Sequence, residues 1–159
     1  LRSAESDFLC LGSLVNDAAQ ICSARPKLGW NDITVMGSIA IYTPELIALG
    51  GDATEGVYTL TFFYPKNPRP AVRQFVKSYE SAYHQMPTWF AAIAYDAVNL
   101  LVKAVRKAGP DRTAIRDALA GIRDFPGVTG NITFKEDGSV RREHLLLQVK
   151  NGEFVLYGH

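Results

Sequence analysis

The sequence predicts an α/β fold built around a parallel sheet with flanking helices. Three short runs rich in apolar or β-branched residues, at 7–12, 32–37 and 57–63, alternate with segments of helical pattern. Such alternation is typical of βαβ units, which have parallel strands and right-handed crossovers. A long amphipathic helical pattern follows at 87–109, and an Asn-Gly pair at 151–152 lies between two apolar runs. We therefore expect a βαβαβ unit, then helices, then a C-terminal β-hairpin.

The composition is that of a globular protein rather than a membrane or nucleic-acid-binding one. Of the 159 residues, 47% are hydrophobic and 21% charged, and the formal net charge is +1. A charge so close to zero gives no electrostatic reason to expect nucleic acid or an anionic membrane as a partner. No apolar run approaches the roughly 20 residues that a membrane-spanning helix needs. The chain opens at Leu1 without a signal-peptide pattern, which fits a processed N-terminus or a piece of a longer protein.

The two cysteines do not define a redox compartment. Cys10 lies in the first apolar run, and Cys22 lies in the helical pattern that follows it. Because free cysteines are among the residues most often buried, we expect both to be free thiols in the core.

The first strand and helix are predicted from residues 7 to 26. Residues 7–12 read DFLCLG, a continuous apolar run that favours a strand buried on both faces. Residues 13–16 form a turn into a helix, with Ser13 or Asn16 as its N-cap. Pro26 ends that helix.

The next elements repeat this pattern. Residues 32–37, DITVMG, predict a second buried strand. Thr43 at the N-cap and Pro44 at the first helical position predict a short helix over 44–49. Residues 57–63, VYTLTFF, predict a third strand because β-branched and aromatic residues favour strands.

The middle of the chain is predicted to be helical. Residues 64–70 contain three prolines and indicate an extended linker. An amphipathic pattern over 71–84 predicts a helix, and Asp111 is the expected N-cap of another helix over 111–122.

The longest predicted helix lies within residues 87–109. Thr88 is placed to cap it, and Gly109 followed by Pro110 is placed to end it. Its apolar stripe needs a sheet or other helices to cover it. We assign to that stripe Trp89, Ile93, Ala97, Leu100, Leu101, Ala104, Val105 and Ala108. To the opposite, polar face we assign Asp96, Asn99, Lys103, Arg106 and Lys107.

The last part of the chain is predicted to form short strands. Residues 130–134 fit one strand, and residues 144–149 and 153–157 fit two more. Asn151-Gly152 separates the last two, and Asn-Gly between apolar runs is the strongest short-range signal of a hairpin.

Motifs for catalysis, metal binding and phosphate binding are missing from the sequence. It contains neither a GxGxxG nor a Walker-type glycine loop, and its three histidines lack metal-ligand spacing. Ser13 and Ser38 each lie between a strand and a helix, but their neighbours do not match a nucleophile elbow. We therefore expect no enzyme activity, no metal and no cofactor.

The positive signal is a pair of turns at strand ends. In an open parallel sheet, ligands bind beyond the carboxyl ends of the strands. Both turns combine a small polar residue with free backbone amides at a helix start, which suits a polar or anionic group. The candidate ligand-binding residues are Gly12, Ser13, Leu14, Val15, Ser38 and Ile39. Ordinary turn chemistry is the alternative explanation.

Five segments carry a family resemblance. Residues 45–58 resemble the "PEL…GDAAEGVY" segment of type I periplasmic solute-binding proteins of the leucine/isoleucine/valine class, which feed ABC transporters. Residues 67–77 are similar to the helix after their linker, and residues 94–98 match their "AYDAV" helix. Residues 124–137 resemble their "DFxGVTGxIxFxEDG" segment, and residues 144–154 their closing strands. The order and spacing of these weak motifs make the match fairly specific.

The resemblance implies part of a two-lobe fold in which ligand binds in the cleft between the lobes. Only the C-terminal half of such a protein is matched. The implied division is residues 1–63 in the second lobe, 64–70 as a linker after a hinge crossing, 71–135 in the first lobe, and 136–159 returning to the second lobe. A missing N-terminal half or self-association would then cover exposed apolar faces.

The implied function is that of an extracytoplasmic solute-binding component of an ABC transporter. Its location would be periplasmic, or extracellular as a membrane-anchored lipoprotein, and its partner a membrane permease. One alternative is the ligand-sensing domain of a regulator or receptor with the same fold, and another is an α/β enzyme.

The resemblance also bears on the ligand. Where amino-acid binders typically have aromatic residues in the first turn, this chain has Leu14 and Val15. Where they place an acidic residue for the ligand's ammonium group, it has Ile39. Since an unpaired buried charge is costly, the expected ligand is less polar than a free amino acid, such as an aromatic or aliphatic carboxylate.

Overall fold

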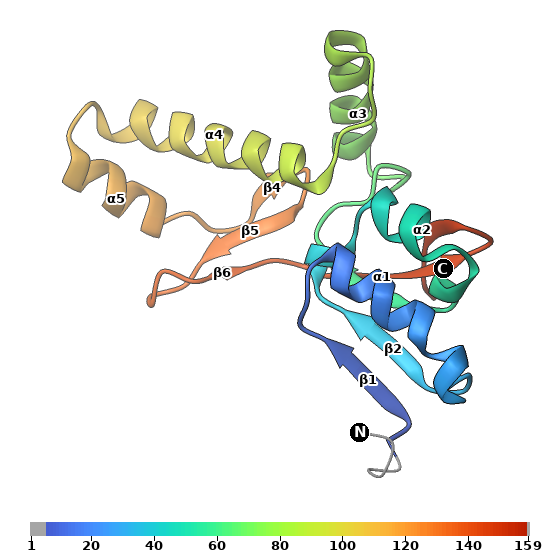
Figure 1. The fold of residues 1–159 in the computed structure, drawn as a ribbon. Coiled ribbons are helices and arrows are strands. Elements are labelled where there is room, and N and C mark those ends of the chain that lie inside the picture. Colours follow the sequence, from blue (N-terminus) through green and yellow to red (C-terminus); the bar gives the residue numbers. More distant parts are fainter. Residues whose placement is uncertain (1–5, 159) are drawn as a thin grey trace. The chain divides into compact units, whose positions relative to one another are not determined.

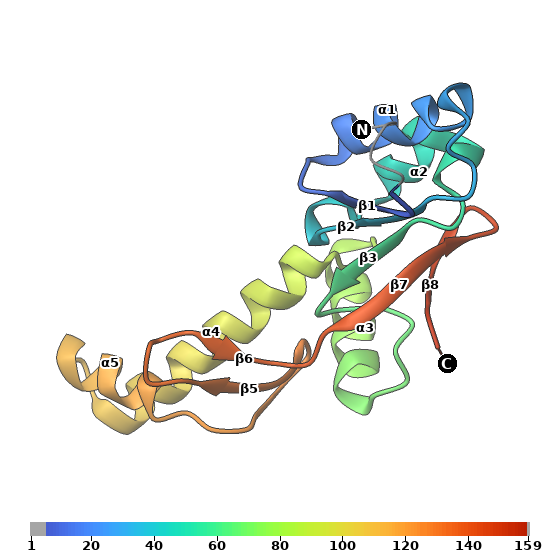
Figure 2. The same ribbon diagram turned by 90° about the horizontal axis from the view of Figure 1, so that it is seen from below.

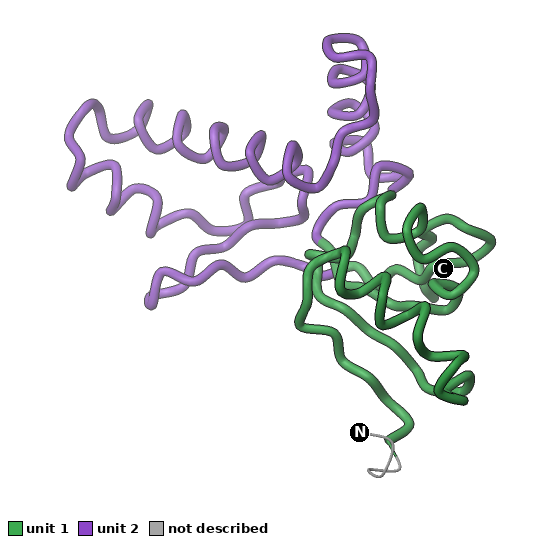
Figure 3. The backbone as a smooth tube through the Cα atoms, in the orientation of Figure 1, with its two compact units in different colours: residues 1–61, 145–159 green, residues 62–144 purple. Residues whose placement is uncertain are grey.

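The computed structural model describes residues 6–158 and divides the chain into two compact units. Unit 1 combines the residues up to Thr61 with those from Leu145 onward, and unit 2 runs from Phe62 to His144 (Figure 3). The chain therefore passes between the units after Thr61 and again after His144. The assignment of residues 1–63, 71–135 and 136–159 to the lobes of a larger protein stays a prediction.

The described residues of unit 1 form a five-stranded mixed sheet (Figure 2). The first three strands along the chain are parallel, and the last two add an antiparallel hairpin, as the sequence predicted. In spatial order the strands are β1 (Phe8–Leu11), β2 (Thr34–Gly37), β3 (Tyr58–Thr61), β7 (Leu145–Lys150) and β8 (Glu153–Leu156).

Two helices cover one face of this sheet. The helices α1 (Val15–Ala24) and α2 (Pro44–Gly50) pack side by side over it (Figure 2). Short 3₁₀ turns, η2 (Pro26–Leu28), η3 (Ile39–Ile41) and η4 (Gly51–Thr54), connect the elements. The core between helices and sheet includes Ala18 and Cys22 of α1, Val35 of β2 and Leu46 of α2. Burial of these apolar side chains is the main force that holds the layer together.

The first strand differs from its prediction. The sequence run at 7–12 predicted burial on both faces, but β1 lies at the edge of the sheet and Phe8 is 46% exposed. Because side chains alternate along a strand, Leu11 points to the buried side and Cys10 to the other. The prediction that Cys10 is a core thiol is therefore wrong, whereas Cys22 is free and buried. Burial raises the pKa of the Cys22 thiol.

Two turns of unit 1 show how local sequence sets the backbone. Asn151 and Gly152 have φ of 54° and 71°, the left-handed conformation that a two-residue hairpin turn requires. The Glu55 carboxylate accepts hydrogen bonds from both backbone N–H groups, at 3.0 and 2.6 Å. The predicted cap of α1 is wrong: the N-cap is Leu14, and no side chain caps this helix among the described residues.

Unit 2 contains three helices and a three-stranded antiparallel sheet (Figures 1 and 2). Two of its strands were not predicted, because one contains Pro126 and the other is only 2 residues long. The Pro-rich segment 64–70 lies in this unit and ends as the first turn of a helix. The helices are α3 (Pro70–Tyr83), α4 (Trp89–Ala108) and α5 (Arg112–Ala120), and the strands are β4 (Phe125–Gly127), β5 (Gly130–Phe134) and β6 (Val140–Arg141).

The N-caps of α4 and α5 are as predicted, but the faces of α4 are not. Thr88 caps α4 and Asp111 caps α5 through backbone N–H groups three residues on. The buried residues of α4 include Asp96, which is 2% exposed. Its predicted place on the face opposite the covered stripe is wrong, because the turn between β4 and β5 packs against Asp96 and hydrogen-bonds to its carboxylate. Conversely Leu101, assigned to the covered stripe, is 49% exposed.

Candidate functional site

The two predicted turns leave the sheet of unit 1 at the same end of its parallel strands. The last residues of β1 and β2, Leu11 and Gly37, are partners in a parallel pair. Gly12 and Ser38 follow them directly, so both turns begin at the carboxyl ends of neighbouring strands (Figure 1). This is the position at which open parallel sheets bind their ligands. We call the six predicted residues, Gly12 to Val15 with Ser38 and Ile39, the strand-end edge.

The second turn is held by hydrogen bonds to the hydroxyl oxygen and to the carbonyl oxygen of its serine. The Ser38 hydroxyl oxygen accepts from the backbone N–H of Ala40 at 3.3 Å and caps η3. The Ser38 carbonyl oxygen accepts from the hydroxyl of Thr59 at 2.9 Å. Thr59 is fully buried and pairs with Gly37 in the sheet. Thr59 was not among the predicted site residues, although a polar residue within the strand expected at 57–63 was an available signal.

The first turn leaves its backbone donors uncapped and the hydroxyl of its serine without a partner among the described residues. Leu14 is extended, with ψ of 173°, and no side chain of the described residues caps the first turn of α1. The N–H groups of that turn, at the positive end of the helix dipole, favour a negatively charged or electron-rich group. The Ser13 Oγ atom is buried and lacks a hydrogen-bond partner among residues 6–158. A Cβ atom at Gly12 would meet no atom within 4 Å, so the space beside Gly12 is open.

The side chains of the strand-end edge are apolar or hydroxyl-bearing. Leu14 is 69% exposed, while Val15 and Ile39 are partly buried. None of the six residues is ionisable. The edge can therefore offer apolar contact and hydrogen-bond donors, but it has no group suited to proton transfer or nucleophilic attack at neutral pH. Within residues 6–158, no cluster of three or more His, Cys, Asp or Glu residues could hold a metal ion.

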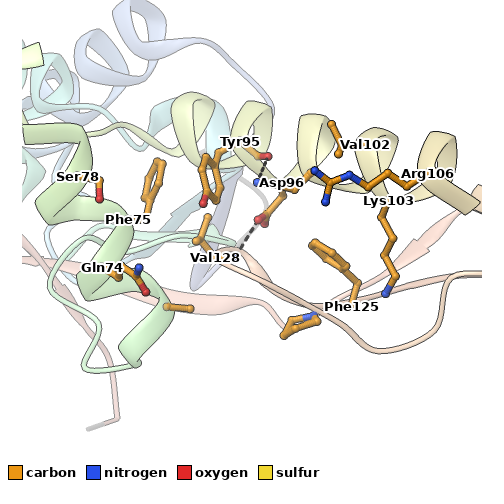
Figure 4. A pocket seen from close by; sticks show the side chains of 13 residues that line it. Gln74, Phe75, Ser78, Tyr95, Asp96, Val102, Lys103, Arg106, Phe125 and Val128 are labelled. Carbon is orange, nitrogen blue, oxygen red and sulfur yellow. Dashed lines mark hydrogen bonds between the residues drawn. The ribbon is translucent and has the colours of Figure 1, made fainter. Parts of the chain in front are cut away.

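Apart from the strand-end edge, a hollow lies within unit 2, between α3, α4 and β4 (Figure 4). Its volume is about 430 Å³. Lys103 supplies a cation at its rim, 5.3 Å from the centre of the Phe125 ring. The Asp96 carboxylate reaches this hollow, but hydrogen bonds within the protein occupy both of its oxygens. Neither the sequence patterns nor these contacts single it out as a ligand site.

The hydrogen bonds of Asp96 fasten the turn between β4 and β5. Its two oxygens accept from the backbone N–H groups of Val128 and Thr129, each at 2.9 Å, and from the Thr129 hydroxyl at 2.7 Å. Arg142 donates to the same hydroxyl oxygen at 3.2 Å. Partial burial lowers the pKa of Arg142, and the charge of Asp96 opposes that shift. This carboxylate is a structural group, fully used in positioning the turn.

Comparison with known proteins finds a family and a relative that match nearly the whole chain. A model of the periplasmic binding protein family matches residues 1–153. A leucine-, isoleucine-, valine-, threonine- and alanine-binding protein of Pseudomonas aeruginosa is 28% identical over 159 residues, covering 99% of this chain and 39% of the relative. The resemblance inferred from the sequence motifs is confirmed.

Solved structures agree with this result. A leucine-binding protein from Thermotoga maritima is similar with a TM-score of 0.89 and 29% identity, over 99% of this chain and 45% of that one. A putative branched-chain amino acid ABC transporter protein from Rhodospirillum rubrum has a TM-score of 0.82 and 38% identity, over 94% of this chain and 44% of that one. The chain thus spans less than half the length of these relatives.

The relatives also bear on the class of activity. Those in Pseudomonas and Thermotoga are named as binding proteins, in agreement with the prediction that this chain is not an enzyme. Among the described residues, no helix combines the length and apolar character that crossing a membrane requires. Because the family model matches almost the entire chain, and the α/β fold is that of solved relatives at high TM-score, the chain belongs to the periplasmic binding protein family.

Proposed function

We propose that this chain contributes to the extracytoplasmic solute-binding component of an ABC transporter, with the strand-end edge as one wall of its ligand site. The observation that carries the proposal is the convergence of two strand-to-helix turns at the ends of β1 and β2. The names of the relatives in Pseudomonas aeruginosa and Thermotoga maritima support solute binding. The name of the Rhodospirillum rubrum relative supports a membrane permease as the partner.

The side chains at this edge favour a ligand with an apolar body. Leu14, Val15 and Ile39 offer aliphatic contact, which suits the branched aliphatic side chains of the solutes named for the relatives. The edge has no carboxylate to pair with an ammonium group. An ammonium group buried against it would lose hydration without gaining a counter-charge. The proposed ligand is therefore an aliphatic or aromatic carboxylate that lacks a free α-amino group.

Calorimetry on the full-length gene product tests this ligand class with three compounds that share one branched aliphatic chain. They are leucine, 4-methylpentanoate, which lacks the amino group, and isopentylamine, which lacks the carboxylate. We expect 4-methylpentanoate to bind at least tenfold more tightly than leucine, and isopentylamine not to bind. Tight binding of leucine with no binding of 4-methylpentanoate would contradict the proposed ligand class. Failure of every small carboxylate and amino acid to bind would contradict solute binding itself.

A substitution at the edge provides a matched test. Ile39→Glu introduces the carboxylate that the edge lacks, so we expect it to shift preference from 4-methylpentanoate toward leucine by about tenfold, roughly 1.4 kcal/mol. Leu49→Glu places the same charge on an exposed residue of α2 that is 58% accessible and should leave both affinities unchanged. Equal responses of the two variants would remove Ile39 from the site.

A further inference from the structure

The charge of the chain is divided unevenly between the two units. Unit 2 contains 13 Lys and Arg residues against 8 Asp and Glu residues, a formal charge of +5. The rest of the chain contains 4 against 8, a formal charge of −4. The total of +1, from which no anionic partner was expected, is therefore the sum of two opposite charges. Electrostatic partners have to be considered for each unit separately.

The cations of unit 2 are concentrated where α4 meets α5. Residues 103–116 contain five Lys or Arg side chains and one acidic side chain, that of Asp111. Because α4 ends at Ala108 and α5 begins at Arg112, the two helix ends lie together at the turn that joins them (Figure 1). Four exposed side chains at this end form a surface called here the α4–α5 tip: Lys103, Arg106, Lys107 and Arg112.

The acidic groups nearest in the sequence do not pair with the α4–α5 tip. The Asp111 carboxylate accepts the N–H of Ala114 as the cap of α5. Asp117 forms its ion pair with Arg116, at 2.7 Å. Within residues 6–158, none of the four side chains of the tip belongs to a salt bridge. Four positive charges are thus exposed without a paired counter-charge.

Helix stability accounts for only part of this charge. Arg106 and Lys107 lie in the last turn of α4, where the helix dipole favours cations. Arg112 occupies the first position of α5, at the opposite end of a helix dipole, where a cation is unfavourable. A cation at an unfavourable helix end, close to three others, indicates a surface that serves binding.

The neighbours of these cations fit a lipid surface better than a protein partner. Protein interfaces concentrate their binding energy in buried aromatic and arginine anchors. A layer of anionic headgroups attracts Lys and Arg through its surface potential and needs no such anchor. The residues between Lys107 and Arg112 supply neither an aromatic nor a long apolar side chain, since they are Ala108, Gly109, Pro110 and Asp111.

We propose that the α4–α5 tip is a docking surface for the anionic phospholipid headgroups of a membrane. The proposal rests on the proposed function in one respect, which is that the permease partner places the protein beside a membrane. Each Lys or Arg near such a surface strengthens binding roughly fivefold, so the four together are expected to contribute on the order of 100-fold or more. The contact is reversible and sensitive to salt, because exposed charges are screened within about 10 Å at 0.1 M ionic strength.

Cosedimentation of the full-length gene product with lipid vesicles tests the proposal. One set of vesicles contains phosphatidylglycerol and phosphatidylcholine in equal parts, and the other contains phosphatidylcholine alone. The second set is electrically neutral and measures binding that does not depend on charge, including that of any lipid anchor. At about 0.02 M salt we expect the anionic vesicles to bind the protein about tenfold more strongly or better, and at about 0.5 M salt we expect no difference.

Two matched variants locate the surface. The tip variant carries Lys103→Gln, Arg106→Gln, Lys107→Gln and Arg112→Gln, and it should lose the preference for anionic vesicles. The control variant removes the same charge from four other exposed residues of unit 2 and should keep most of the preference. Its substitutions are Arg73→Gln, Lys77→Gln, Lys135→Gln and Arg141→Gln.

A single substitution covers the case in which the tip variant folds poorly. Lys107→Glu is expected to weaken binding to anionic vesicles roughly fivefold or more. Thermal melting followed by circular dichroism checks that each variant keeps the fold of the parent protein.

Three outcomes would overturn the proposal. The first is equal binding of the parent protein to anionic and neutral vesicles at low salt. The second is an equal loss in the tip and control variants, which would show that net charge acts without a defined surface. The third is binding of polyglutamate through the tip without binding of anionic vesicles, which would identify an acidic protein as the partner. The vesicle assay contains no solute, so its failure is distinguishable from a failure of solute binding in calorimetry.

Discussion

At the scale of single residues, carboxylates that accept backbone N–H groups set the geometry of both units. In unit 1, Glu55 binds the two N–H groups of the turn between β7 and β8. In unit 2, Asp96 does the same for Val128 and Thr129, but from a buried position. A buried carboxylate is tolerated only when such donors replace its hydration. The close approach also explains Gly127, since a Cβ atom there would lie 2.5 Å from Oδ2 of Asp96.

Removal of the buried carboxylate should be costly. Asp96→Ala leaves the buried N–H groups of Val128 and Thr129 and the Thr129 hydroxyl without their acceptor. We therefore expect a loss of about 3 kcal/mol or more in the free energy of unfolding, measured by urea denaturation. Asp117→Ala is the control, because its ion pair with Arg116 is exposed and should contribute less than about 0.5 kcal/mol. Similar losses in the two variants would show that the Asp96 hydrogen bonds do not stabilise the fold.

At the scale of elements, caps matter most where packing is weakest. The helix α5 has 9 residues and none of them is fully buried. Helices this short are marginal by themselves, so their ends contribute a large share of their stability. Asp111 accepts from the Ala114 N–H at 2.8 Å, and its negative charge lies at the favourable end of the helix dipole.

Two substitutions distinguish the contribution of the hydrogen bond that Asp111 accepts from the contribution of its charge. Asp111→Ala removes both and should lower the free energy of unfolding by about 1 kcal/mol. Asp111→Asn keeps an acceptor oxygen and should lower it by only a few tenths of that amount, roughly 0.3 kcal/mol. Circular dichroism during urea denaturation measures both. A loss for the Asn variant as large as for the Ala variant would mean that charge, not the hydrogen bond, is what Asp111 supplies.

At the scale of the whole molecule, the apolar cores belong to separate units. The cluster around Leu46 and Val35 draws on unit 1 alone, and those around Phe75 and Ile132 draw on unit 2 alone. The chain crosses between the units twice. Cooperative unfolding depends on shared buried contacts, so two separate cores favour two transitions rather than one.

The two tryptophans report on the units individually. Trp30 lies in unit 1 and Trp89 packs on the core of unit 2, so Trp30→Phe and Trp89→Phe each leave a single fluorescent probe. With Asp96→Ala added, we expect the urea midpoint seen by Trp89 to fall by roughly 1 M or more. The midpoint seen by Trp30 should stay where it was. Coincident shifts of both probes would show that the chain unfolds as one cooperative body.

Local sequence signals predicted two helix N-caps and one hairpin turn correctly, whereas the predicted cap of α1 was wrong. Thr88 and Asp111 cap their helices as predicted, and Asn151-Gly152 forms the hairpin turn. The strand-end edge was also foreseeable, because consecutive strand-to-helix turns of a parallel sheet must come out on one side. What it binds stays a proposal. The strands β4 and β6 were missed because they are too short to show a period-two pattern.

By itself, the sequence determined the α/β class, the order of the main elements and the membership of a binding-protein family, because these depend on periodicity, caps, turns and motif order. Only the tertiary structure decided which faces are buried. It placed Asp96 inside, left Leu101 and Cys10 accessible, and put β1 at a sheet edge. The physical reason is that a helix or strand with two apolar faces does not encode which one meets its own unit. That choice is made by the elements that pack against it.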